Sequence, residues 1–152
     1  MSLANRIIAW ALARKPNLNV GGEADPYMRR WYVIPRNPVL NIYIHQFMRD
    51  DEDRAKHDHP WISLSWLMRG RLVEICGDGA AALWPGAIRL RGPWFAHRLI
   101  VPTDYRRDTW TLFITGPRLR HWGFHCPNGW VHWRDFTAGE HGEVVGRGCG
   151  ES

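Results

Sequence analysis

The sequence predicts an all-β domain, a sandwich or barrel of short strands preceded by one short α-helix. Segments rich in β-branched and aromatic residues follow one another at short intervals, and Pro, Gly or Asp separates nearly all of them. The 152 residues include 15 glycines and 10 prolines, which favour tight turns over long helices. A chain of this length is most simply one domain with its own core.

The N-terminal sixteen residues, MSLANRIIAWALARKP, predict the helix, with Ser2 as its candidate N-cap and Pro16 after its end. We expect this helix to cap an end of the β domain or to cover a sheet edge. The chain then divides into the helix and connector (1–20), a single β domain (21–136) and a glycine-rich, loosely held tail (137–152). Eight strands are expected, at residues 29–35, 39–48, 60–68, 71–76, 81–84, 87–91, 95–101 and 109–116.

Charge and cysteine usage narrow the class of protein. The net charge is +5, but the arginines are scattered and no long basic run is present, so nucleic acid is not an expected partner. The three cysteines, at positions 76, 126 and 149, show no CxxC spacing; this argues against a disulfide framework and favours a reducing compartment. The N-terminal apolar run is too short to span a bilayer. We therefore expect a cytoplasmic protein with no membrane partner.

The stretch HDHPW places His57 and His59 two residues apart at the entry to a predicted strand. Residues i and i+2 of a strand point to the same face, so both imidazoles can approach one metal ion. A third ligand must come from a neighbouring strand. The candidates are the histidines at positions 45, 97, 121, 125 and 132.

The pattern around these histidines resembles the two motifs of the cupin superfamily, G-x5-H-x-H-x3,4-E-x6-G and G-x5-P-x-G-x2-H-x3-N. His57 and His59 match the histidine pair, Gly70 and Gly86 match conserved motif glycines, and His97 lies at the family's distance from Gly86. The sequence departs from the motifs at Asp51, Ser63, Trp94 and Val101, and Pro93 stands one place late; Ser63 occupies the position of the acidic ligand. The local patterns also resemble small single-domain cupins of bacteria and phages, a group that implies no particular activity.

This resemblance implies a cupin-type double-stranded β-helix, an RmlC-like jelly-roll barrel. It implies a metal site made by His57, His59 and His97, which looks like the three-histidine iron site of the thiol dioxygenases. One divalent transition metal is expected there, with Fe(II) favoured and Zn, Ni or Cu as alternatives.

Other residues are candidates for contact with a substrate. Tyr43 and His45 alternate with a purely apolar face, so we expect them near the metal, in substrate contact or proton transfer. Ser63, Arg89 and Arg91 are candidates for hydrogen bonds to a bound water, carboxylate or phosphate. Arg98 is a further candidate of the same kind. On the strand 87–91 the two arginines share one face and Ile88 and Leu90 share the other, and the sequence leaves open which face is inside.

Three residues late in the chain are His121, His125 and Cys126. We expect them in a structural corner with Trp122, Phe124 and Trp130; the alternatives are a lid that folds back over the site and adds an aromatic wall and a base, and a second zinc site. The acidic run 50–53 is expected to be a solvated loop, with Asp53 or Asp58 as an alternative orienting group for a histidine ligand.

The favoured function is a metal-dependent, dioxygenase-type oxidoreductase acting on a small polar or anionic molecule. Two alternatives stay open: a non-catalytic cupin module that binds a small molecule or a metal, and a Zn- or Ni-dependent isomerase or hydrolase. A homodimer that pairs through an edge strand is also expected, with residues 29–35 as the candidate edge.

Overall fold

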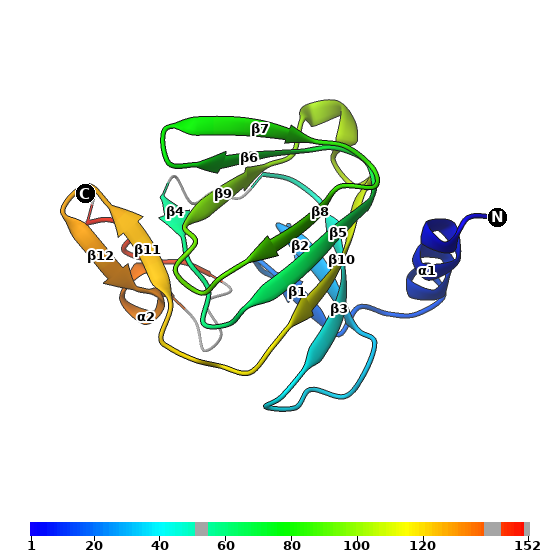
Figure 1. The fold of residues 1–152 in the computed structure, drawn as a ribbon, viewed down its shortest axis with the longest axis horizontal. Coiled ribbons are helices and arrows are strands. Elements are labelled where there is room, and N and C mark those ends of the chain that lie inside the picture. The colour runs from blue at the N-terminus through cyan, green and yellow to red at the C-terminus, as the bar shows by residue number, and fades with distance from the viewer. Residues whose placement is uncertain (51–54, 139–143, 151–152) are drawn as a thin grey trace.

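Two six-stranded antiparallel sheets form the body of the protein (Figure 1). The structure is a computed structural model and describes residues 1–50, 55–138 and 144–150. The first sheet has the order β1-β2-β3-β10-β5-β8, and the second has the order β12-β11-β4-β9-β6-β7. The strands of the first sheet are β1 (Leu18–Val20), β2 (Met28–Tyr32), β3 (Asn41–Phe47), β10 (Thr109–Thr115), β5 (Ser63–Arg69) and β8 (Ile88–Arg91). Those of the second are β12 (Gly129–His132), β11 (Gly123–Cys126), β4 (Lys56–His57), β9 (His97–Ile100), β6 (Leu72–Cys76) and β7 (Gly79–Leu83).

The remaining elements are short. Helix α1 spans Leu3–Leu12, a 3-10 turn spans Thr103–Tyr105, and α2 spans Trp133–Phe136. Strands β13 (Thr137–Ala138) and β14 (Val144–Val145) pair with each other. No helix among the described residues is long and apolar enough to cross a membrane.

The predicted fold class is confirmed, because the described chain is mostly antiparallel strand with one short N-terminal helix. All eight predicted strands are present. The expectation of a closed barrel is wrong, because each sheet keeps its own two end strands and the two sheets are not joined by strand pairing in the described residues. Sequence reasoning missed β1, β4, β11 and β12, which are two to four residues long and too short for a hydrophobic period.

Helix α1 packs on the outer face of the first sheet, opposite the second sheet. Ser2 caps it as predicted, accepting a hydrogen bond from the Asn5 amide at 3.3 Å. The helix covers the middle strands of the sheet, so the expectation that it caps an end or an edge is wrong (Figure 1). The buried residues of this outer core are Ile8, Ala11, Trp31, Ile44, Met68 and Trp110.

The inner face of the first sheet is divided between an apolar end and a polar end. Along β3, Ile44 belongs to the outer core, so Tyr43, His45 and Phe47 point inward. Phe47 belongs to a core between the sheets, whose buried residues are Met28, Phe47, Leu67, Leu72, Leu83 and Val101. His45 and Tyr43 lie toward the other end, where polar residues replace aliphatic ones.

The C-terminal part of the chain is held against the second sheet. Hairpin β11–β12 joins the sheet through β4, with Phe124 opposite His57. A disulfide links Cys126 to Cys149, while Cys76 is free. The expectation that the cysteines stay unpaired is therefore wrong, and so is that of a loosely held tail for its described residues. A disulfide is typical of oxidising compartments. The cysteines therefore no longer support the predicted cytoplasmic location, which stays a prediction.

The segment proposed as the dimer edge does not present a free edge. β2 lies between β1 and β3, and Met28, Arg29 and Arg30 are paired on both sides. The free edges of the first sheet are β1 and β8. A homodimer stays a prediction, but residues 29–35 are not its pairing strand.

Replacing Ile8 with Ala should lower the free energy of unfolding by about 2–5 kcal/mol, because the side chain is 2% exposed within the outer core. Leu12→Ala is the matched control in the same helix; Leu12 is 61% exposed, so we expect a change within about 0.5 kcal/mol. Urea denaturation of both variants measures the difference. Equal effects would show that the helix does not depend on its packing against the sheet.

Candidate metal centre

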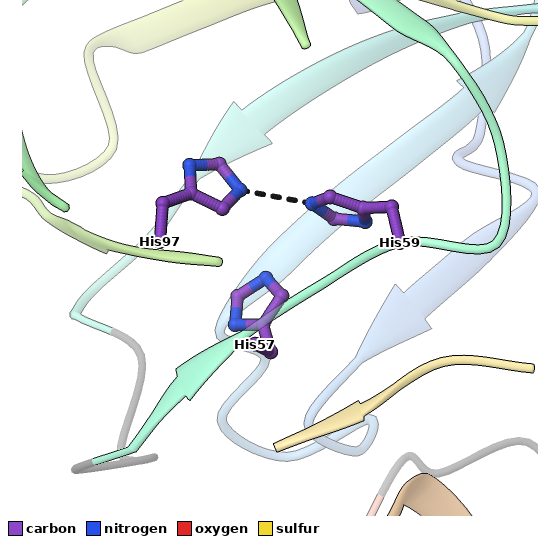
Figure 2. Close-up of side chains that lie close together, drawn as sticks. All are labelled: His57, His59 and His97. Atoms are coloured by element: carbon purple, nitrogen blue, oxygen red, sulfur yellow. Dashed lines mark hydrogen bonds between the residues drawn. The ribbon is translucent and has the colours of Figure 1, made fainter. Parts of the chain in front are cut away.

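Three histidines from two neighbouring segments of the second sheet point toward one another (Figure 2). Antiparallel pairing of β4 and β9 places His57 opposite His97, and His59 follows two residues after His57. The three ring centroids are 5.1–5.2 Å apart. One nitrogen from each ring lies within 4.8 Å of the other two, and no second metal-binding group of this kind is found in the part of the chain that the structure describes.

This arrangement fits a transition metal. Bonds of about 2.0–2.1 Å from nitrogen to a metal place two neighbouring ligand nitrogens about 3.0–3.4 Å apart. The Nε2 atoms of His59 and His97 are 2.9 Å apart, so this pair needs little movement to share an ion. Three neutral imidazoles suit Fe(II), Zn, Ni or Cu, and they leave coordination positions for water and substrate.

The surroundings keep His57 and His59 neutral. Burial, followed by the neighbouring His97, lowers the pKa of His57 from 6.5 to about 3. Burial and the charges of the other two histidines hold the pKa of His59 well below its ordinary value; the charges of Arg91 and Arg30 act in the same direction. A metal binds the unprotonated imidazole, so these two side chains are in the binding form at neutral pH.

Glu74 of β6 orients the third histidine. Its Oε1 lies 2.6 Å from the Nδ1 of His97, so the Nδ1–H donates to the carboxylate and Nε2 faces the other two rings. Burial alone would raise the pKa of Glu74, but the hydrogen bond from His97 and the charge of Arg91 outweigh it and lower the pKa. A carboxylate behind a liganding histidine fixes its tautomer and raises its basicity.

Sequence reasoning missed Glu74. The feature of the sequence that could have indicated it is one acidic residue within the apolar strand LVEIC, residues 72–76. Such a residue is buried only when it is paired.

The two arginines of β8 differ in their surroundings. Arg91 is 5% exposed; it donates to Glu74 from Nε at 2.7 Å and to the hydroxyl of Ser65 at 2.8 Å. Arg89 is on the same inward face, but it is exposed and its Nε is 3.9 Å from Glu74. The apolar side of this strand is therefore the exposed one, with Leu90 73% accessible. Both predicted arginines face inward, and Arg91 is already neutralised by Glu74.

Ser63, at the position of the acidic cupin ligand, is also inside the protein. Its side chain is 1% exposed, and its hydroxyl makes no hydrogen bond with another described residue. The serine that reaches the Glu74–Arg91 ion pair is Ser65, two positions further along the same face of β5. A role for Ser63 in contact with a bound molecule stays a prediction.

Tyr43 and His45 lie on the inner face of the first sheet, next to Phe113. The His45 ring is 5.3 Å from Phe113, which is itself 6.3 Å from His59. Arg30 donates from Nε to the Nε2 of His45 at 2.9 Å, and burial keeps the pKa of His45 well below normal. His45 is therefore neutral with its remaining proton on Nδ1, which makes it a hydrogen-bond donor rather than a base.

Asp58 does not orient a metal-binding histidine. Its side chain points away from the His57 and His59 rings and is 1% exposed. It accepts hydrogen bonds from the Gly123 amide at 2.9 Å and the Trp130 indole at 3.0 Å. Two side chains complete its contacts, His125 at 3.1 Å and Arg120 at 2.9 Å. Asp53, the other candidate, lies outside the described residues.

Two of the residues considered for a second zinc site have other partners: Cys126 is in the disulfide and His125 contacts Asp58. The structural corner is present. Trp122 and Phe124 pack 6.3 and 5.8 Å from His57, while Trp130 is exposed on the opposite side of the hairpin. In the acidic run, Asp50 accepts from the Val101 amide and pairs with Arg106, and residues 51–53 lie outside the described residues.

Comparison with solved structures shows that the fold is similar to that of several cupins. An RmlC-like cupin from Shewanella frigidimarina NCIMB 400 is similar with a TM-score of 0.51 and 15% identity, over 66% of this chain and 85% of that one. The DMSP lyase DddQ from Ruegeria pomeroyi DSS-3 is similar with a TM-score of 0.58 and 16% identity, over 76% of this chain and 62% of that one. FeII HppE is similar with a TM-score of 0.52 and 17% identity, over 63% of this chain and 54% of that one. The sequence matches no protein-family model and no curated protein.

Replacing Glu74 with Gln should weaken metal binding about 10- to 100-fold, because His97 loses the carboxylate that orients it. Titration of the metal-free protein with Fe(II) or Zn measures the affinity, and Glu23→Gln, on the surface, is the control. Glu74→Gln also leaves Arg91 buried without its carboxylate, so the double variant Glu74→Gln/Arg91→Met is needed to restore stability. We expect it to fold well and still bind metal weakly. Normal affinity in the double variant would contradict this role.

The free energy of unfolding of the metal-free protein should decrease as the pH is lowered below about 6.5. Folding lowers the pKa of His57 to about 3, so between these two values the unfolded chain binds more protons than the folded one. This histidine alone then costs up to about 1.4 kcal/mol of stability for each pH unit. Urea denaturation between pH 7 and 4 should give a smaller slope for His57→Asn than for the unmodified protein. His121→Asn, at an exposed histidine, is the control, and equal slopes for all three proteins would contradict the prediction.

Proposed function

We propose that the protein is a metal-dependent enzyme of the dioxygenase type, which oxidises a small anionic molecule at an Fe(II) ion held by His57, His59 and His97. The observation that carries this proposal is the cluster of three imidazoles together with a half-buried arginine, Arg30, which has no carboxylate partner among the described residues. When bound, the metal supplies the binding of dioxygen and its reduction by the substrate. The chain's own residues hold the metal, orient the substrate and keep water away.

Arg30 supports an anionic substrate. Its guanidinium donates to His45 and lies 4.9 Å from the centre of the Tyr43 ring, and no described carboxylate pairs with it. Burial lowers its pKa, which reflects the cost of a desolvated charge. The buried arginine Arg91, which also faces inward, has Glu74 as its counter-ion. A carboxylate or similar anion on the substrate would give Arg30 the partner that the protein does not provide.

The surroundings of the triad favour redox chemistry at the metal over hydrolysis or isomerisation. The rings that touch the three histidines are Phe95, Phe113, Trp122 and Phe124, which carry no proton-transfer group. Tyr43 and His45 make no hydrogen bond with the triad among the described residues. Hydrolysis and isomerisation need an acid or base within hydrogen-bond reach of the substrate, whereas a dioxygenase leaves bond making to the metal.

The proposal predicts about one equivalent of iron in protein purified without a histidine tag, and none in the double variant His57→Ala/His97→Ala. With Fe(II) restored under anaerobic conditions, a panel of small thiols and carboxylic acids is then tested for oxygen uptake in an oxygen-electrode cell. We expect turnover of at least one anionic compound, and Arg30→Met should raise its KM at least tenfold while metal content stays unchanged. Arg29→Met, on the neighbouring position of β2, is the matched control.

Each outcome of this experiment separates the alternatives. Protein that takes up no metal on titration would overturn both the metal site and the enzyme. Bound metal without oxygen uptake for any compound would favour the non-catalytic binding module. Turnover with a KM that Arg30→Met does not change would contradict the proposed contact of Arg30 with an anionic substrate, while the metal site would still stand.

A further inference from the structure

The outer face of the second sheet carries a groove that the metal site does not use. It has a volume of about 740 Å³ and lies over the same strands, β4 and β9, that carry His57 and His97 on their inner face. Side chains of a strand alternate between faces, so Lys56 and Arg98 point outward where His57 and His97 point inward. Both line this groove, together with His125 of β11.

The sheet register places these three side chains in one row. His57 is opposite His97 in antiparallel pairing, so Lys56 is opposite Arg98. On its other side Lys56 is opposite His125. Like charges directly opposite each other on neighbouring strands destabilise a sheet. Lys56 and Arg98 therefore form a local concentration of positive charge that an anion in the groove would relieve.

No carboxylate lines the groove among the described residues. Lys56 donates to the backbone carbonyl of Gly77 at 2.7 Å. The Nε of Arg98 is buried and has no hydrogen-bond partner among the described residues. Since no described carboxylate lines the groove, an anion bound there would supply the Arg98 guanidinium with a counter-ion. His125 differs, because Asp58 already contacts it from behind.

Two aromatic side chains form part of the wall. Trp94 is 72% exposed and Phe95 is 38% exposed, and both precede β9 in the chain. Exposed aromatic faces beside cationic side chains recognise flat rings that carry negative charge, by stacking and by charge pairing together. The disulfide Cys126–Cys149 lines the same groove, so its far side is covalently fixed.

We propose that this groove is a second binding site, separate from the metal centre, for a small anion that carries a planar ring. Arg98 and Lys56 bind the anionic group, and Trp94 contacts the ring. The proposal does not depend on the metal or on the proposed enzymatic activity, because Lys56 and Arg98 lie on the faces of β4 and β9 opposite His57 and His97.

Calorimetric titration with phenyl phosphate tests the site, with inorganic phosphate as the anion that lacks a ring and benzyl alcohol as the ring that lacks the charge. We expect phenyl phosphate to bind at least tenfold more tightly than either. Arg98→Gln should weaken its binding at least tenfold and Trp94→Ala should weaken it severalfold. Arg36→Gln, at an exposed arginine outside the groove, should leave the affinity unchanged.

Binding at the metal centre is the alternative that the variants distinguish. If phenyl phosphate binds there, His57→Ala abolishes binding and Arg98→Gln does not, which overturns the proposal. Equal affinity for phenyl phosphate and inorganic phosphate would overturn the role of the aromatic wall. Absence of heat with phenyl phosphate, confirmed by unchanged chemical shifts of the Trp94 indole on NMR titration, would overturn the site as a whole.

Discussion

The buried carboxylate of Asp58 fixes the segment on which two of the three metal-binding histidines lie. Burial alone would raise its pKa, but hydrogen bonds from Arg120, the Gly123 amide, His125 and Trp130 outweigh that effect and lower it. A buried carboxylate is tolerated only when its oxygens are satisfied in this way. Because Asp58 stands between His57 and His59, its hydrogen bonds to hairpin β11–β12 hold the backbone segment that carries both side chains. The candidate metal site therefore depends on a part of the chain far from it in sequence.

Side chains alternate between the two faces of a strand, so the short segment 56–59 presents histidines on one face and charged residues on the other. His57 and His59 point between the sheets, toward His97 and the aromatic rings around it. Lys56 points to the outer groove, and Asp58 points to the C-terminal hairpin. Ser63 stands where the cupin motif has its acidic ligand, so the three candidate ligands His57, His59 and His97 form a neutral donor set.

The electrostatics of the inner face rest on the contrast between two arginines. Arg91 is neutralised by Glu74, and this pair orients His97. Arg30 has His45 and the Tyr43 ring as its neighbours, and neither carries a negative charge. One arginine thus supports the histidine cluster through Glu74, while the other has no carboxylate partner among the described residues. Both act on His59, whose pKa they help to lower.

The sequence by itself determined eight of the strands and the capped helix, because these follow from local spacing: alternation within a strand and a serine before a helix. It also indicated the histidine set, through its resemblance to the cupin motifs, in which a third histidine follows the HxH pair at a set distance. Tertiary structure alone decided which face of β8 is inside, since Arg91 finds partners in Glu74 and Ser65 from other strands. It also decided the roles of Glu74, Arg30 and Asp58 and the pairing of Cys126 with Cys149. Each of these contacts joins residues 15 to 72 positions apart. Over such distances, strand order and register decide which residue becomes the partner of a buried charge or thiol. A local sequence pattern contains no information on strand order or register.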